Sequence, residues 1–379
     1  MSARQRRERH TIYLIPGFFG FANLGRLHYF VHVDRFLRER CAARGVDARV
    51  HVVRTHPTAS LPNRAALVIE TLARSLRGPS EVAHLIGHST GGVDARLATA
   101  PGVALPTDVD VARWAGRVRS VVGVSAPHHG TPLAAWLTTR RGQQLLALFS
   151  LATSYVLRFG HLPLSALLSL ATVFGREDRP RRKGTLFDDL SERLLTDFSA
   201  TRRRAVARLL REVVEDQSLL MQVTPESMDL FNAAVRDRPG VRYGSVVTRS
   251  RPPGLRTTLA AGLDPGAQAI HAIYGAIYRV SATTPRAATP RADVAQRRAL
   301  RQAYGKVPAA HANDGIVPTR SQVWGRVIRA VRGDHLDVIG HFNDPSTEPP
   351  HFDWLTTGSG FDRAGFEAVW ERVLDFVLA

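Results

Sequence analysis

The fold of this chain is decided by the stretch Val82-Ala83-His84-Leu85-Ile86-Gly87-His88-Ser89-Thr90-Gly91-Gly92. Its first five residues form an apolar run typical of a buried strand, and a helical pattern of small residues follows over Thr90–Thr99. Gly87 and Gly91 flank Ser89 at the spacing G-x-S-x-G, which leaves room for the strand and the helix to approach each other. This turn lifts the serine Oγ clear of the sheet and aims helix amides at the same point. We therefore predict that Ser89 is a nucleophile.

Five further apolar runs, on both sides of this stretch, are predicted to be strands. They are Thr11–Ile15, Ala48–Val53, Val118–Val124, Val241–Val247 and Arg326–Val331. Helical stripes lie over Leu61–Leu76 and Asp362–Leu378. This alternation favours an α/β fold with a mostly parallel central sheet flanked by helices.

Two segments interrupt the alternation. No strand pattern occurs between Pro132 and about Thr224, and Pro252–Ala312 has proline-rich ends and a helical middle. We predict a core formed by 1–132, 224–251 and 313–379, a helical lid or cap insertion over 133–223, and a second helical insertion over 252–312. The nearly uncharged stretch Leu145–Phe174 would cover an apolar trough, either as a mobile lid or as a fixed cap.

The composition limits the function classes. The 379 residues include 51 Lys+Arg, 33 Asp+Glu and one cysteine, Cys41, so neither an intrachain disulfide nor a cysteine-based metal site is expected. The net charge of +18 comes mainly from scattered arginines without interleaved aromatic residues, which argues against specific nucleic-acid binding. No apolar stretch follows the basic start, and none is long enough to span a membrane. We therefore expect a cytoplasmic protein, with peripheral association with a membrane left open.

A nucleophilic serine needs a base within hydrogen-bond reach and an acid that orients the base. Asp314, in a compact turn before the last predicted strand, is the predicted acid, and His335, directly after that strand, is the predicted base. Both follow Ser89 in the chain order expected for a G-x-S-x-G serine. Asp264 is the alternative acid, and the alternative bases are His341 and His351.

The remaining predicted site residues lie in the loops after strands. Two backbone amides should stabilise the oxyanion, one on Thr90 and one on Phe18 in the loop after the first strand, with Phe19 as the alternative to Phe18. Phe19, His88 and His128 are predicted to contact the substrate. Chain order argues against His128, and against His129 beside it, as the base.

Five stretches together resemble α/β-hydrolase-fold lipases and esterases, in particular the bacterial triacylglycerol lipases. In chain order they are Ile15–Gly20, Gly87–Gly92, Ser125–Leu133, Thr224–Asn232 with Val241–Ser245, and Asn313–Pro318 with Asp334–Asp337. The resemblance implies hydrolysis of carboxylic esters of lipid-like substrates through an acyl-enzyme on Ser89, with no organic cofactor.

The chain also departs from that family's pattern. Pro16 stands where those lipases usually have a histidine before the oxyanion glycine. They often bind a structural calcium near the catalytic histidine, and Asp337 stands at a matching ligand position. However, His341 stands where an amide oxygen would be expected, and calcium prefers oxygen ligands. A calcium site at Asp337 is therefore kept as a hypothesis.

Three other functions remain open at this stage. An acyltransferase would use the same three residues with an alcohol as acceptor, and a thioesterase or polyester depolymerase would differ only in its substrate. A non-enzymatic protein that binds nucleic acid or membranes is disfavoured because serine, acid and histidine are all present in the expected order. The sequence does not indicate an oligomeric state.

Overall fold

The computed structural model describes residues 9–18, 29–78, 80–139, 218–284 and 290–379, together with residues 142, 199, 200, 203, 204 and 216. Phe19 and the predicted lid stretch Leu145–Phe174 lie outside the described residues. The prediction of a mobile lid or a fixed cap therefore stays a prediction.

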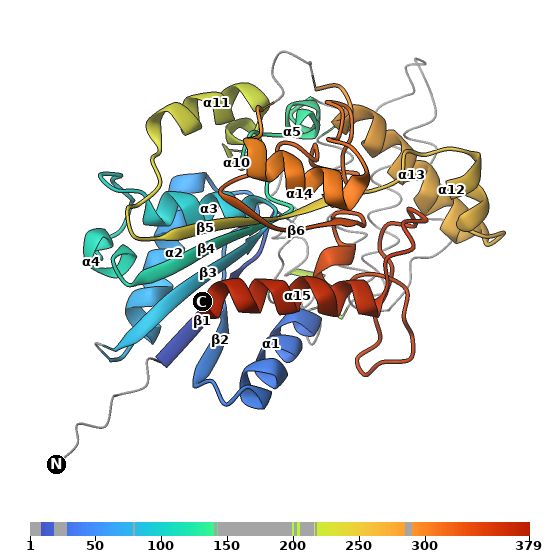
Figure 1. Cartoon of the computed structure of the whole chain (residues 1–379). Helices are drawn as coiled ribbons and strands as arrows, with labels where there is room; N and C mark the ends of the chain where they lie inside the picture. Colours follow the sequence, from blue (N-terminus) through green and yellow to red (C-terminus); the bar gives the residue numbers. More distant parts are fainter. Residues whose placement is uncertain are drawn as a thin grey trace.

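The described core is a six-stranded parallel sheet (Figure 1). Each of the six apolar runs forms a strand, and the sheet order is β2-β1-β3-β4-β5-β6. The strands are β1 Arg9–Ile15, β2 Ala48–Val52, β3 Glu81–His88, β4 Val118–Val124, β5 Arg242–Arg249 and β6 Arg326–Arg332. The α/β class predicted from the sequence is confirmed.

Helices cover both faces of the sheet. One face packs against α1 (Val31–Ala43) and α15 (Arg363–Leu378), and the other packs against α2 (Leu61–Ser75) and α3 (Thr90–Thr99) (Figure 1). Neighbouring residues of β1 alternate between the two cores, with Leu14 on the α1 side and Ile15 on the α2 side. Burial of both faces explains the apolar runs of the inner strands β1, β3 and β4, whereas the edge strands β2 and β6 are only partly buried and carry arginines.

The remaining elements follow β3 in the chain. The helix α14 (Val294–Tyr304) packs against β6, although the sequence assigns it to the insertion over 252–312. That division of the chain stays a prediction. The other helices are α4 Val111–Ala115, α5 Pro132–Leu137, α10 Ser218–Gln222, α11 Pro225–Ala234, α12 Leu255–Ala260, α13 Pro265–Ser281 and the short 3₁₀ helix η1 Asp337–Ile339. None of the helices in the described part of the chain is long and apolar enough to cross a membrane.

The order of the strands locates the site. The chain passes from β1 to β2 on one side of β1, and then returns to place β3 on the other side. Because α1, which follows β1, and α3, which follows β3, lie on opposite faces, the loops that leave these two strands diverge at their carboxyl ends. Open parallel sheets bind their ligands at such a point.

Candidate active site

Ser89 occupies a strained turn between β3 and α3. Its φ is 54°, in a region that residues other than glycine rarely adopt. The flanking glycines make this turn feasible, because a Cβ on Gly87 would lie 2.1 Å from the carbonyl carbon of Gly91, and one on Gly91 would lie 2.2 Å from the oxygen of Ile15. The spacing G-x-S-x-G is therefore a steric requirement here. Ser89 is 7% exposed.

The loop after β1 lies directly against Ser89. A Cβ on Gly17 would lie 2.5 Å from the Ser89 Cβ and 3.1 Å from its Oγ, so only glycine fits. The buried guanidinium of Arg64 donates to the carbonyl oxygen of Pro16 at 2.8 Å and pairs with the Asp94 carboxylate on α3 at 2.6 Å. This buried ion pair ties the loop before Phe18 to the helix that follows Ser89.

The residues of the predicted oxyanion hole are chain neighbours of Ser89 and of Gly17, which packs against it. Thr90 is the first residue of α3, and the first amides of a helix have no partner within the helix. Phe18 follows Gly17, whose backbone touches Ser89. The structure thus brings Ser89, Thr90 and Phe18 together.

Asp314 is a fully buried carboxylate that accepts five hydrogen bonds. Its Oδ1 accepts from the backbone amides of Ile316 at 3.0 Å and Val317 at 2.7 Å. Its Oδ2 accepts from Thr248 Oγ1 at 2.8 Å, Gln322 Nε2 at 3.0 Å and His335 Nδ1 at 2.8 Å. Asp314 therefore closes its own turn and orients a histidine at the same time.

His335 is held by the acid through its ring and through its backbone. Nδ1 donates to the Asp314 carboxylate at 2.8 Å, and the backbone amide donates to the Asp314 carbonyl oxygen at 3.0 Å. A proton on Nδ1 leaves Nε2 of the neutral ring as an acceptor. The ring is 4.7 Å from that of His88, the residue before Ser89. His335, Asp314 and the turn that carries Ser89 therefore lie together at the carboxyl end of the sheet.

The alternative acid and bases have structural partners elsewhere. The Asp264 carboxylate accepts from the Ala267 amide and caps α13. His341 donates from Nε2 to the Tyr29 carbonyl oxygen at 3.3 Å, and His351 donates from Nδ1 to the Gly340 carbonyl oxygen at 2.6 Å. Among the histidines with described contacts, only His335 bonds to Asp314.

Comparisons with known proteins agree with this geometry. A metagenomic carboxyl esterase superposes with a TM-score of 0.53 over 99% of this chain and 76% of its own, at 16% identity. The Staphylococcus hyicus lipase gives 0.52 over 100% and 98%, at 14% identity, and lipase 1 from Pelosinus fermentans gives 0.50 over 97% and 98%, at 15% identity. The chain has the α/β-hydrolase fold of lipases and esterases.

The sequence itself aligns with one curated relative of this fold over a shorter stretch. A triacylglycerol lipase from Pseudomonas fragi is 31% identical over 153 residues, which cover 39% of this chain and 45% of that lipase. The alignment thus spans less than half of the relative. No protein-family model matches the chain.

Two residues predicted to contact substrate lie inside this α/β-hydrolase core. His88 is 0% exposed, and both its ring nitrogens are bonded to protein groups. His128 is 1% exposed, and neither ring nitrogen has a hydrogen-bond partner in the described part of the chain. Burial, with repulsion from Arg96 and His129, lowers the pKa of His128 well below its usual value. Its ring lies 5.8 Å from that of Trp324.

Three carboxylates gather beside His335. Asp334, Asp337 and Asp353 each place an oxygen within 4.8 Å of the others. Burial, with repulsion from Asp337 and Asp353, raises the pKa of Asp334 well above its usual value. Burial raises the pKa of Asp337 to about 7 and that of Asp353 to about 6. The sequence indicated only Asp337, and His341 lies outside this cluster.

The donor set of the three carboxylates suits a hard cation. Oxygen ligands are what calcium prefers, and a divalent charge would offset the repulsion between buried carboxylates. The run Asp334-His335-Leu336-Asp337 could have indicated Asp334 as a further ligand. Asp353 lies farther along the chain, and no local pattern in the sequence indicates that it returns to this run.

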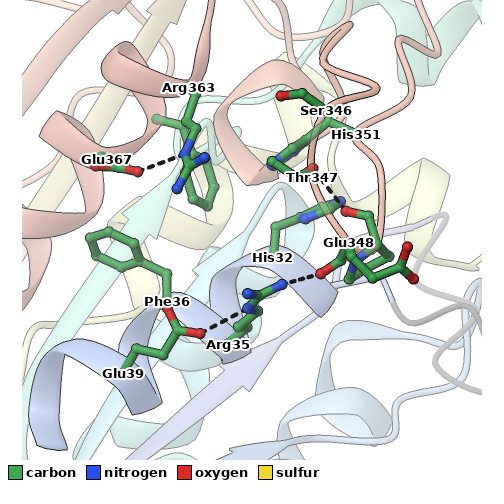
Figure 2. Close-up of a pocket in the computed structure, with 12 residues that line it drawn as sticks. His32, Arg35, Phe36, Glu39, Ser346, Thr347, Glu348, His351, Arg363 and Glu367 are labelled. Atoms are coloured by element: carbon green, nitrogen blue, oxygen red, sulfur yellow. Dashed lines mark hydrogen bonds and ion pairs between the residues drawn. The ribbon is translucent and has the colours of Figure 1, made fainter.

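A separate hollow of about 290 Å³ lies between α1, the 346–351 loop and α15 (Figure 2). The ring of His32 stacks on that of His351 at 3.6 Å in this hollow. Its two guanidinium groups are paired, Arg35 with Glu39 and Arg363 with Glu367. None of the predicted site residues lines it.

Proposed function

We propose that the protein hydrolyses carboxylic esters of lipid-like substrates through an acyl-enzyme on Ser89. One arrangement carries the proposal. Ser89 occupies a strained turn, the ring of the preceding His88 lies 4.7 Å from that of His335, and Nδ1 of His335 is bonded to the buried Asp314 carboxylate at 2.8 Å. The fold shared with lipases and esterases and the partial likeness to a triacylglycerol lipase support an ester as substrate.

In the first step, His335 Nε2 accepts the proton of the Ser89 hydroxyl while Oγ attacks the ester carbonyl carbon. The carbonyl oxygen becomes an oxyanion, and the amides of Phe18 and Thr90 donate to it. Such preorganised donors cost no reorganisation at the moment of reaction, and each contributes about 3 kcal/mol to lowering the barrier in well-studied cases.

In the second step, the tetrahedral intermediate collapses and the ester C–O bond breaks. His335 gives its proton to the departing alkoxide, which leaves as the alcohol and leaves an acyl group on Ser89. Water then attacks the acyl-enzyme, with His335 accepting its proton and returning one to Ser89. Asp314 holds the imidazole tautomer and stabilises the imidazolium through both half-reactions.

The experiment is hydrolysis of p-nitrophenyl acetate, octanoate and palmitate by the wild type and by Ser89→Ala. We expect turnover of the longer esters and a loss of at least about 10³-fold in kcat in the variant. Ser120→Ala, which removes another buried hydroxyl from the neighbouring strand β4, is the matched control. Equal rates for wild type and Ser89→Ala would refute the proposal. Ester products formed from an added alcohol in place of free acid would assign an acyltransferase.

We propose further that Asp334, Asp337 and Asp353 hold a structural calcium ion. When bound, it would neutralise the carboxylates on both sides of His335 and connect the loop after β6 to the segment around Asp353. It takes no part in the proton transfers above. The ion would instead stabilise the backbone that carries the base.

Thermal melting with calcium and with a chelator tests this site. We expect calcium to raise Tm by several degrees, and Asp353→Asn to abolish that increase. Asp344→Asn is the control, because Asp344 lies on the same loop and bonds to Ser346 outside the cluster. An identical Tm with calcium and with chelator would refute calcium binding.

A further inference from the structure

His88, the residue before the nucleophile, is bonded at both ring nitrogens. Nε2 contacts the carbonyl oxygen of His335 at 2.8 Å, and Nδ1 contacts the hydroxyl of Tyr29. The ring is completely buried. It therefore bridges the backbone of the predicted base to a residue at the start of α1.

The two hydrogen-bond partners of His88 determine which of its ring nitrogens carries the proton. A carbonyl oxygen only accepts, so His88 Nε2 must carry a proton and donate to His335. Burial, with repulsion from His335, lowers the pKa of His88 well below its usual value, so the ring is neutral and Nδ1 is an acceptor. The Tyr29 hydroxyl consequently donates to Nδ1.

The Tyr29 hydroxyl forms the other end of this bridge. One buried series of hydrogen bonds runs from Tyr29, two residues before α1, through the His88 ring to the backbone of His335. It joins the segment that leads into α1 with the residue that removes the proton from Ser89.

At the His335 end of the series, His88 and Asp314 together hold the ring and the backbone of His335. Asp314 binds its ring and its backbone amide, and His88 binds its carbonyl oxygen. With both backbone polar groups and Nδ1 occupied, Nε2 is the one ring nitrogen left for the substrate reaction. The base is therefore fixed by contacts on the side of Asp314 and on the side of Ser89.

We propose that His88 is a positioning residue, which sets the position of the base through the series Tyr29–His88–His335. This inference rests on the proposed ester hydrolysis. His88 touches neither the substrate nor the reacting atoms. Displacements of about 1 Å between reacting groups can cost about 100-fold in rate, so the loss should appear in kcat more than in KM.

Two amide substitutions separate the two bonds of His88. His88→Gln places an amide nitrogen near the position of Nε2 and can still donate to the His335 carbonyl oxygen. His88→Asn reaches only the position of Nδ1, so it keeps the bond from Tyr29 and loses the bond to His335. We expect kcat to fall by about 3-fold to 10-fold in His88→Gln and by about 30-fold to 100-fold in His88→Asn, with KM within about twofold of wild type.

Tyr29→Phe tests the other bond of the series. Alone, it should lower kcat by about 3-fold to 10-fold, since it removes one buried hydrogen bond. Combined with His88→Gln, it should add little, because the bond between residues 29 and 88 is already gone in that background. A fully multiplicative effect in the double variant would overturn the series.

The matched control lies on the same strand and the same face. His84 is also buried and bonded at both ring nitrogens, to His10 at 3.0 Å and to Ser120 at 2.8 Å. His84→Asn should lower Tm while leaving kcat within about twofold of wild type. If His88→Asn does the same, His88 is only structural and the proposal fails.

The assays also separate this inference from the proposed function. Absence of any Ser89-dependent ester turnover in the wild type would refute the hydrolase itself. Turnover in the wild type that persists undiminished in His88→Asn would refute only the positioning role.

Discussion

The central strand β3 carries buried polar side chains in both halves, but only those at its carboxyl end surround an atom that can react. In the amino half, Glu81 and His84 bond to groups that simply satisfy them. At the carboxyl end, Ser89 is forced into an unfavourable φ, and the loop at Gly17 packs against its side chain. Burial and hydrogen bonding alone therefore do not distinguish the candidate active site; backbone strain at Ser89 together with this close packing does.

Two buried carboxylates show the same contrast: Glu81 at the amino end of β3 and Asp314 at the carboxyl end of the sheet. Burial alone would raise the pKa of Glu81, but the amides of Arg77 and Gly78 and the guanidinium of Arg49 lower it below its usual value. Asp314 has hydrogen-bond donors and a histidine around it. Glu81 thus faces a guanidinium with a fixed charge, whereas Asp314 faces the histidine that the proposed mechanism uses as the base.

The largest expected effect comes from removing the charge of Asp314. Asp314→Asn should lower kcat by about 10³-fold to 10⁴-fold, because the amide neither stabilises an imidazolium nor selects the right tautomer. Steady-state kinetics on an octanoate ester measures it. Glu81→Gln, the same change at the other end of the sheet, should lower Tm and leave kcat within about twofold. Similar kcat values for the two variants would remove the distinction between the two ends.

A smaller effect concerns acid stability in the amino half. Burial, with repulsion from His10, Arg242 and Arg119, lowers the pKa of His84 to about 3. Below pH of about 6.5 the unfolded chain takes up a proton on this residue that the folded chain does not, so folding stability falls as pH falls toward 3. The slope is at most about 1.4 kcal/mol per pH unit for this group.

Urea unfolding at several pH values measures this dependence. His84→Asn should flatten the decline below pH of about 6.5 relative to wild type, while leaving stability above that pH without a new pH dependence. Parallel curves for wild type and variant would show that His84 is protonated equally in both states.

The smallest expected effect on kcat comes from a residue near Asp314, at the carboxyl end of the sheet. Thr248 Oγ1 donates to Asp314 Oδ2 at 2.8 Å, and Thr248→Val removes that donor while keeping the shape of the side chain. Loss of one hydrogen bond to a charged group corresponds to about 1.4 kcal/mol, or about tenfold in kcat. Ser120→Ala removes a comparable buried hydroxyl in the amino half and should leave kcat unchanged. Unchanged kcat in Thr248→Val would mean that the remaining donors suffice.

The parts of the structure that follow from local patterns were predicted from the sequence. The strands were predicted, because strands that are buried on both faces are continuous apolar runs in the sequence. The contact between Asp314 and His335 was also predicted, from the chain order of acid and base after the G-x-S-x-G serine and from the position of His335 directly after the last strand. The roles of these residues in catalysis stay predictions.

Other parts depend on contacts that no local pattern encodes. Tyr29 reaches His88 across the sheet edge, and Gln322 reaches Asp314 only after the intervening turn has formed. The sequence gives no separate indication of the contacts of His88, because this residue is already accounted for as the position before the serine in G-x-S-x-G. Asp353 joins Asp334 and Asp337 through a loop whose path depends on packing against α1 and α15.

The long-range nature of the bridge between His88 and His335 has a consequence during synthesis. These residues are 247 positions apart, so the ribosome makes the strained serine turn long before the base exists. Parallel sheets assemble from distant segments and therefore late in folding. A nascent chain that ends before β6 would carry the nucleophile without the histidine that activates it. Under the proposed mechanism, Ser89 would become reactive only after the segment that carries His335 has been translated and has docked.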